Sequence, residues 1–194
     1  MSDNNVISIN VHDEVGTVDV GPGGPPAPAP EPLPELIGQY VAPHSLPGRV
    51  VTAEDVGRVV EEAAMMHRLC LSPAGMYPSA LALAHTQVEK DEPLRFFVTV
   101  AGEIIVNPYI VNHSGTTVDN KEGCMSFPVD EPKTVQRWNV VELKFQTVLK
   151  DGTLSDPQVK TFSGKISKII QHETAHLNGK CIYDESISAE DCLN

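Results

Sequence analysis

Residues 171–181 have the sequence QHETAHLNGKC, and the pattern His-Glu-x-x-His within them decides the expected fold and chemistry. On an α-helix, residues four positions apart lie one turn above each other, with about 6 Å between their Cβ atoms. His172 and His176 can therefore bind one metal ion together, with Glu173 beside them as a base for a water molecule. Such a short pattern also arises by chance and from ordinary helical histidines, so it needs support from the rest of the chain.

The residues around this pattern predict a helix over about 164–178. Ser163 is a favourable N-cap, and Gly179 is a favourable residue just past the C-terminus. Apolar side chains recur at helical spacing, at Ile166, Ile169, Ile170 and Leu177. The histidine pair therefore lies on, or beside, the face that packs against the rest of the protein.

Upstream segments predict a second helix and several strands. Thr52 followed by Asp55 is typical of a helix N-terminus, and apolar residues recur at helical spacing after it. Residues 95–107 predict strands around a turn at Ala101-Gly102, and residues 138–162 predict a hairpin around Asp151-Gly152. Because helices and strands do not alternate, we expect an α+β fold with antiparallel strands packed around a central helix that carries His-Glu-x-x-His.

Residues 1–48 differ in composition from the rest of the chain. Residues 21–34 contain ten Pro or Gly in fourteen positions, which predicts a linker with polyproline character. Alternating Val and Ile in the first twenty residues could form an added strand, but we favour a weakly attached arm. We therefore expect a flexible acidic extension over 1–48, a metal-dependent domain over 49–184, and a short acidic tail over 185–194.

Charge and hydropathy exclude several classes of partner. The net charge is −12, and residues 1–48 contain six acidic side chains but no Lys or Arg, so no basic surface for nucleic acid or anionic membrane is expected. No apolar run has the length of a membrane span, and the N-terminus lacks the basic and apolar parts of a secretory signal. Because the sequence shows no secretory signal, we expect a cytoplasmic protein with reduced cysteines. None of the four cysteines forms a Cys-x-x-Cys pair.

A catalytic site of this type needs a third protein ligand. The metzincin pattern would place it at residue 182, which is Ile182, so that class is excluded. A thermolysin-type site would need a downstream glutamate, and Glu185 and Glu190 lie in a short polar tail. Upstream, residues 122–126 have the sequence EGCMS, and their Cys124, taken alone, is better explained as a small core residue.

Three segments together resemble the motifs of the peptide deformylase family. EGCMS resembles that family's EGCLS, and QHETAHLNG resembles QHExDHLxG. Residues 80–87, ALALAHTQ, stand where the first motif, GxGLAAxQ, is expected. The resemblance covers about residues 49–184. The short acidic end is similar to phage-encoded members, and because it lacks the family's basic C-terminal helix, we do not expect ribosome docking by that route.

The resemblance implies one divalent metal ion bound by Cys124, His172 and His176. The metal is most often Fe²⁺ in that family, with Ni²⁺, Co²⁺ or Zn²⁺ as substitutes. The implied reaction is hydrolysis of the N-formyl group from the formylmethionine of newly made polypeptides, which releases formate. It takes place in bacterial-type cytoplasm, including that of an infected host.

The resemblance also implies a role for each neighbouring residue. Glu173 would move the proton, while the side chain of Gln87 and the backbone N–H of Met125 would stabilise the oxyanion. The peptide would be flanked by Leu81 and Leu83, would pass close to Gly123, and would pair like an added strand. Glu122 and Arg137 are either a supporting ion pair or two solvated charges.

The chain departs from the family's first and third motifs at four positions. Ala80 and Ala82 replace glycines, His85 replaces an alanine, and Ala175 replaces an aspartate. Alanine disfavours a positive φ and adds a methyl group where the substrate backbone would pass. Two alternatives therefore stay open: a metallopeptidase with another third ligand, and a metal-binding relative without catalytic activity.

Overall fold

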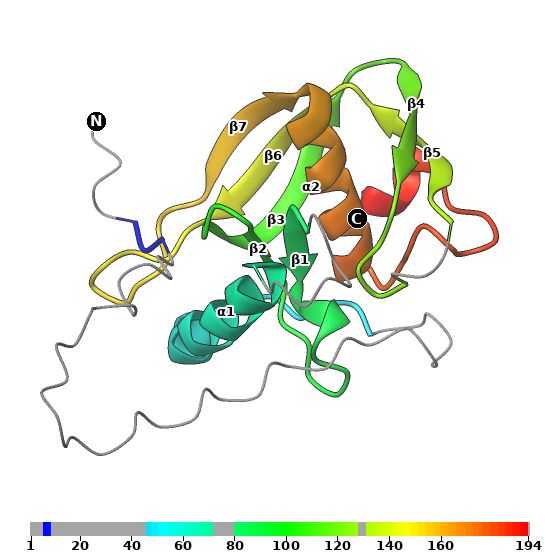
Figure 1. Cartoon of the computed structure of the whole chain (residues 1–194). Helices are drawn as coiled ribbons and strands as arrows, with labels where there is room; N and C mark the ends of the chain where they lie inside the picture. The colour runs from blue at the N-terminus through cyan, green and yellow to red at the C-terminus, as the bar shows by residue number, and fades with distance from the viewer. Residues whose placement is uncertain (1–5, 9–45, 72–79, 128–130, 194) are drawn as a thin grey trace, which may run out of the picture.

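The computed structural model describes residues 6–8, 46–71, 80–127 and 131–193. Within these residues the structure has two α-helices and two antiparallel sheets, whose arrangement can be followed in Figure 1. In chain order the helices and strands are α1 (Val56–Leu71), β1 (Ala82–Ala84), β2 (Phe96–Thr99), β3 (Ile104–His113), β4 (Thr117–Glu122), β5 (Lys133–Trp138), β6 (Val140–Gln146), β7 (Gln158–Ser163) and α2 (Gly164–Leu177). All these strand pairs are antiparallel, so the expected α+β class is confirmed.

Helix α2 lies centrally in the molecule. The larger sheet has the order β1-β2-β3-β6-β7, and the smaller one consists of β4 and β5. Helix α2 contacts the larger sheet and also β5, so it lies between the two sheets (Figure 1). The helix that carries His-Glu-x-x-His is therefore held from both sides.

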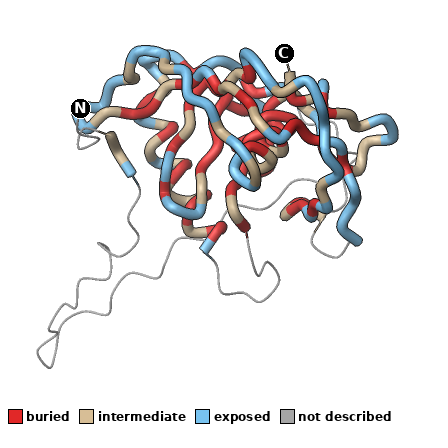
Figure 2. The backbone as a smooth tube through the Cα atoms, turned by 90° about the horizontal axis from the view of Figure 1, so that it is seen from above, coloured by how far each residue is buried: buried red, intermediate tan, exposed pale blue. Residues whose placement is uncertain are grey.

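The apolar core consists of two main clusters, one under α1 and one under α2, because successive side chains of the strands point to opposite faces of the sheet. Leu83 and Phe96 belong to a buried cluster that includes the inner face of α1. Ala84 and Phe97, their neighbours in sequence, belong to a second cluster that includes Ile170 of α2. Successive strand residues point to opposite faces, so a sheet covered on both faces buries nearly every residue of these strands. Figure 2 shows this buried interior as continuous red stretches of the backbone.

The expected helix ends are confirmed. The backbone N–H of Thr52 donates a hydrogen bond to Asp55 Oδ2 at 2.7 Å, and α1 follows a short 3₁₀ turn, η2 (Ala53–Asp55). Ser163 is the N-cap of α2, and Gly179 has φ 75° just past its C-terminus. The left-handed conformation at that position is the one that glycine adopts without strain.

The strand predictions were correct in kind and incomplete in extent. Strands β2 and β3 form around the expected turn, but β3 continues to His113, and β6 and β7 form the expected hairpin. The sequence interpretation contained neither the three-residue β1 nor the β4–β5 hairpin. Strand β1 and the β4–β5 hairpin both border the candidate site.

A short N-terminal segment pairs with the domain. Val6 and Ser8 form isolated bridges with Leu149 and Glu103, and the N–H of Ile7 donates to the carbonyl of Val148 at 2.9 Å. The end of the expected flexible extension is also described: Gly48 is buried, and its N–H donates to the carbonyl of Leu177 at 2.9 Å. Residues 1–5 and 9–45, including the linker at 21–34, lie outside the described residues. In the described part of the chain, neither helix is long and apolar enough to cross a membrane.

Candidate metal centre

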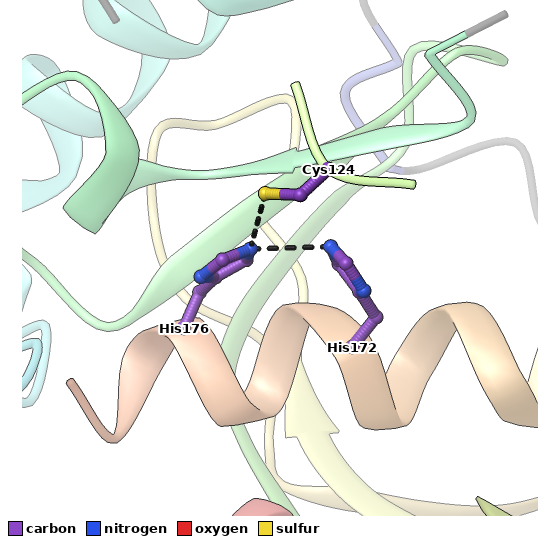
Figure 3. A group of neighbouring side chains, drawn as sticks. All are labelled: Cys124, His172 and His176. Atoms are coloured by element: carbon purple, nitrogen blue, oxygen red, sulfur yellow. Dashed lines mark hydrogen bonds between the residues drawn. The ribbon is translucent and has the colours of Figure 1, made fainter. Parts of the chain in front are cut away.

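Cys124, His172 and His176 converge at one point (Figure 3). Helix α2 presents the two imidazoles from consecutive turns, with 3.1 Å between their Nε2 atoms. Cys124, in the loop after β4, places its Sγ 3.3 Å from His176 Nε2. The three ligand atoms lie within 4.8 Å of one another, and within residues 6–8, 46–71, 80–127 and 131–193 this is the only such group. The structure therefore brings together the three residues expected to bind the metal.

A buried glutamate orients one of these histidines. His172 Nδ1 lies 2.9 Å from Glu122 Oε2, and Arg137 donates two hydrogen bonds to the same carboxylate at 2.8 and 3.0 Å. The ion pair between Glu122 and Arg137 is thus confirmed, and the alternative of two solvated charges is wrong. Because Glu122 accepts the Nδ1 proton, Nε2 is the His172 nitrogen left to bind a metal ion, and it faces the other ligands.

The charges of these groups favour cation binding. Burial alone would raise the pKa of the Cys124 thiol, but His176 and His172 beside it lower this pKa well below its usual value. Burial also opposes charge on Glu122, but hydrogen bonds from His172 and Arg137 hold its pKa well below the usual range. The thiolate is the form of cysteine that binds metals. The site therefore offers one thiolate and two imidazoles.

Glu173 lies next to the ligands and is nearly fully buried. Burial raises the pKa of this carboxyl above its usual value, although His172 and His176 partly oppose the shift. Its Oε2 atom makes no hydrogen bond within the described part of the chain. A buried carboxylate oxygen without a hydrogen-bond partner reduces the free energy of unfolding. Such atoms are found at catalytic sites, where the group makes its hydrogen bond only when substrate is bound.

Gln87 reaches the centre from a short 3₁₀ turn, η3 (His85–Gln87), which follows β1. Its Oε1 accepts a hydrogen bond from the N–H of Ala84 at 2.9 Å, which fixes the orientation of the amide. Its Nε2 donates to Ser126 Oγ at 3.1 Å and lies 3.7 Å from Cys124 Sγ. The sequence interpretation assigned no role to Ser126; the signal that could have found it is its position as the last residue of EGCMS.

The loop that contains Cys124 has open space at Gly123. The N–H of Phe127 donates to the carbonyl of Cys124 at 3.0 Å, which closes a turn around the half-buried Met125. Gly123 is exposed, and a Cβ atom added there would meet no atom within 4 Å. The structure therefore has open space at Gly123.

Leu81 and Leu83 differ in how deeply their side chains are buried. Leu81 is half-buried next to β1, and its carbonyl accepts a hydrogen bond from Val100 N–H at 2.9 Å. Leu83 is fully buried in the cluster under α1, because its side chain points to the opposite face of β1 from Ala82 and Ala84. We therefore correct the expectation for Leu83: its side chain belongs to the core and does not flank a peptide.

The donor set suits a divalent transition metal. One thiolate with two imidazoles is a set that binds Fe²⁺, Ni²⁺, Co²⁺ or Zn²⁺, and three protein ligands leave a position for water or substrate. The alternatives for the third ligand fit less well. Ile182 is buried in the core, and Glu185 and Glu190 are exposed outside the ligand group.

Comparison with known proteins shows the family of the chain. The family model "Polypeptide deformylase" matches residues 74–191. Among curated relatives, a peptide deformylase of Chlorobium phaeovibrioides is 31% identical over 91 residues, which cover 47% of this chain and 44% of the relative. One of Wolbachia pipientis is 36% identical over 75 residues, which cover 39% of this chain and 38% of the relative. The chain thus spans less than half the length of these relatives.

Solved structures show the same fold over most of the chain. A K1U-bound class I type b peptide deformylase of Acinetobacter baumannii superposes with a TM-score of 0.62 and 28% identity, covering 77% of this chain and 95% of that chain. The deformylase of the Vibrio parahaemolyticus bacteriophage VP16T, in complex with actinonin, has a TM-score of 0.61 at 22% identity. It covers 76% of this chain and 99% of that chain, and at this identity it supports the fold alone. Because the family model matches well over half of the chain, the protein belongs to the polypeptide deformylase family.

Proposed function

We propose that this chain hydrolyses the N-formyl group of formylmethionine at the N-terminus of newly made polypeptides and releases formate. The observation that carries the proposal is the convergence of Cys124, His172 and His176 beside the unpartnered Glu173. A divalent cation held by the three ligands would lower the pKa of a water molecule toward neutrality and so supply a nucleophile at ordinary pH.

The residues around the ligands supply the remaining chemistry. Glu173 Oε2 accepts the proton of the attacking water and then delivers it to the nitrogen of the leaving amine. Negative charge develops on the formyl oxygen, and the Nε2 of Gln87 and the N–H of Met125 are the donors available to stabilise it. Removal of one such donor typically lowers kcat by about 10²–10³-fold.

The sheet edge offers a place for the peptide. Strand β1 is at one end of the five-stranded sheet, so an extended peptide can add to it through main-chain hydrogen bonds. Leu81 would contact the bound peptide, and the open space at Gly123 would admit its backbone. The alanines in the first motif do not obstruct this arrangement through backbone strain. Of the non-glycine residues that the structure describes, only Asn107 has a positive φ.

The native metal is proposed to be Fe²⁺, and the compartment a bacterial-type cytoplasm in which formylated chains emerge. Ferrous iron on a thiolate ligand is sensitive to air, so iron-loaded protein should lose activity on oxidation, whereas nickel-loaded protein should keep it. Equal loss with both metals would argue against dependence on iron.

The test of function is release of formate from formyl-Met-Ala-Ser. Nickel-loaded protein should release formate well above the metal-free control, and no release above that control would favour a relative without catalytic activity. Glu173→Ala should abolish activity in a deformylase and in a metallopeptidase alike, so this variant does not discriminate between them. Cys124→Ala separates the two, because it should abolish metal binding only if Cys124 is a ligand. Cys192→Ala, at another buried thiol, is the matched control and should retain the metal.

A further inference from the structure

His85 replaces an alanine of the family motif and is almost completely buried, with 1% of its surface exposed. Its Nε2 lies 2.6 Å from Glu62 Oε2 on α1, and its Nδ1 accepts the backbone N–H of Leu94 at 2.8 Å. Because the Leu94 amide can only donate, the imidazole proton is on Nε2 and is donated to the glutamate. The ring also stacks on Phe96, with 4.6 Å between the ring centroids. The side chain is thus held from three directions.

The carboxylate that receives this hydrogen bond is itself fixed. Arg58 Nε donates to Glu62 Oε1 at 2.9 Å, so each carboxylate oxygen has its own donor. Both residues lie on α1, one turn apart. We call the hydrogen-bonded residues Arg58 and Glu62 the clamp on His85. Both lie on a helix that contributes none of the metal ligands.

The turn held by this clamp ends in the proposed oxyanion donor. The carbonyl of His85 accepts hydrogen bonds from Val88 N–H and Glu89 N–H, both at 3.0 Å, which close the turn that contains Gln87. Thr86 Oγ1 in the same turn donates to the carbonyl of His176 at 3.0 Å. The position of Gln87 relative to Cys124 is therefore set from two sides, by α1 through His85 and by α2 through Thr86.

From these contacts we propose that Glu62 and His85 are a pair of positioning residues that hold Gln87 in place for the reaction. The proposal rests on the proposed deformylase function. None of the hydrogen bonds described above joins the pair to a metal ligand, so we expect the pair to affect the reaction through the 85–87 turn. An alanine at residue 85, as in the family motif, would leave the Leu94 N–H without the acceptor that His85 provides.

The sharpest test is a double-mutant cycle with Gln87, measured on nickel-loaded protein with formyl-Met-Ala-Ser. Glu62→Ala should lower kcat about tenfold with nickel content and KM little changed, because a displaced oxyanion donor loses part of its ~10²–10³-fold effect. Glu62→Gln keeps an acceptor for His85 Nε2–H and should retain activity. Glu61→Ala, at the exposed neighbour on α1, is the matched control.

The cycle distinguishes positioning from general destabilisation. In a Gln87→Ala background, Glu62→Ala should cause almost no further loss of kcat, because the group through which it acts is already absent. The same fold loss in both backgrounds, or no loss in either, would overturn the proposal. His85→Ala should behave like Glu62→Ala, and the glutamate variants carry the test if His85→Ala folds poorly.

A second measurement does not depend on turnover. Gln87 Nε2 points toward Cys124 Sγ, so the thiolate-to-metal absorption band of cobalt-substituted protein should respond to its position. The band should move in the same direction in Gln87→Ala and Glu62→Ala, and stay in place in Glu61→Ala. An unmoved band in Glu62→Ala would overturn the positioning role even if the wild-type protein released no formate. Absence of formate release by the wild type would instead refute the proposed function alone.

Discussion

At the scale of single residues, the carboxyl of Glu173 is unfavourable for stability and useful for chemistry. Glu173 is buried, and one of its oxygens has no partner within the described residues. Its folded-state pKa is raised by burial, so the folded protein binds the proton more tightly than the unfolded chain does, whose glutamate pKa is about 4.3. The corresponding stabilisation is complete below about pH 4.3 and is lost as the pH rises through the folded-state value.

Glu173→Gln should therefore abolish turnover but stabilise the metal-free protein at pH 7, by about 1 kcal/mol, because an uncharged side chain replaces a buried charge. The gain should shrink as the pH falls toward about 4, where the wild-type carboxyl is protonated as well. Urea denaturation of metal-free protein across this pH range measures it. Glu185→Gln, at an exposed site, should show no such trend. A gain that is independent of pH would contradict the explanation.

At the scale of elements, the β4–β5 hairpin is joined to α2 by one buried charge network. Glu122 at the end of β4 receives hydrogen bonds from Arg137 of β5 and lies in contact with His172 of α2. Removing one partner of a buried ion pair leaves an uncompensated charge, which typically costs about 3–5 kcal/mol, whereas replacing both by apolar groups is far less costly. Loss of either Glu122 or Arg137 alone should therefore destabilise the packing of the β4–β5 hairpin against α2.

Arg137→Leu is expected to destabilise the metal-free protein by about 3–5 kcal/mol, and Glu122→Leu combined with Arg137→Leu should recover a large part of that loss. Denaturant unfolding of the single and double variants measures both values. Thr134→Ala, at an exposed position of β5, is the control and should stay within about 0.5 kcal/mol of wild type. A double variant no more stable than Arg137→Leu would show that the ion pair is not the connection.

One contact of this network could not be predicted from the sequence. The family resemblance offered the pairing of Glu122 with Arg137 only as one of two alternatives. The contact of Glu122 with His172 joins residues fifty positions apart, and it depends on how β4 packs against α2. Strand β4, with the sequence TVDNKE, is mostly exposed and has no apolar alternation, so no periodic signal predicts it. Its pairing with β5 supplies the order that its own sequence lacks.

At the scale of the whole molecule, three distant segments form one centre. Both ends of α2, its buried stripe and the antiparallel strands before it could be predicted, because caps and hydrophobic periodicity are local signals. The side chain of Leu83 was placed wrongly, since a three-residue strand gives too little alternation to show which face is buried. The clamp on His85 could not be foreseen either, because it requires α1 to pack over the 85–87 turn.

The central claim is that Cys124, His172 and His176 share one cation. X-ray absorption spectroscopy of protein loaded with one equivalent of Zn²⁺ tests it most directly, because sulfur and nitrogen ligands are distinguished by bond length. We expect one sulfur at about 2.3 Å and two imidazole nitrogens at about 2.0–2.1 Å, with the sulfur absent in Cys124→Ser. A wild-type spectrum that contains only nitrogen and oxygen neighbours would contradict it.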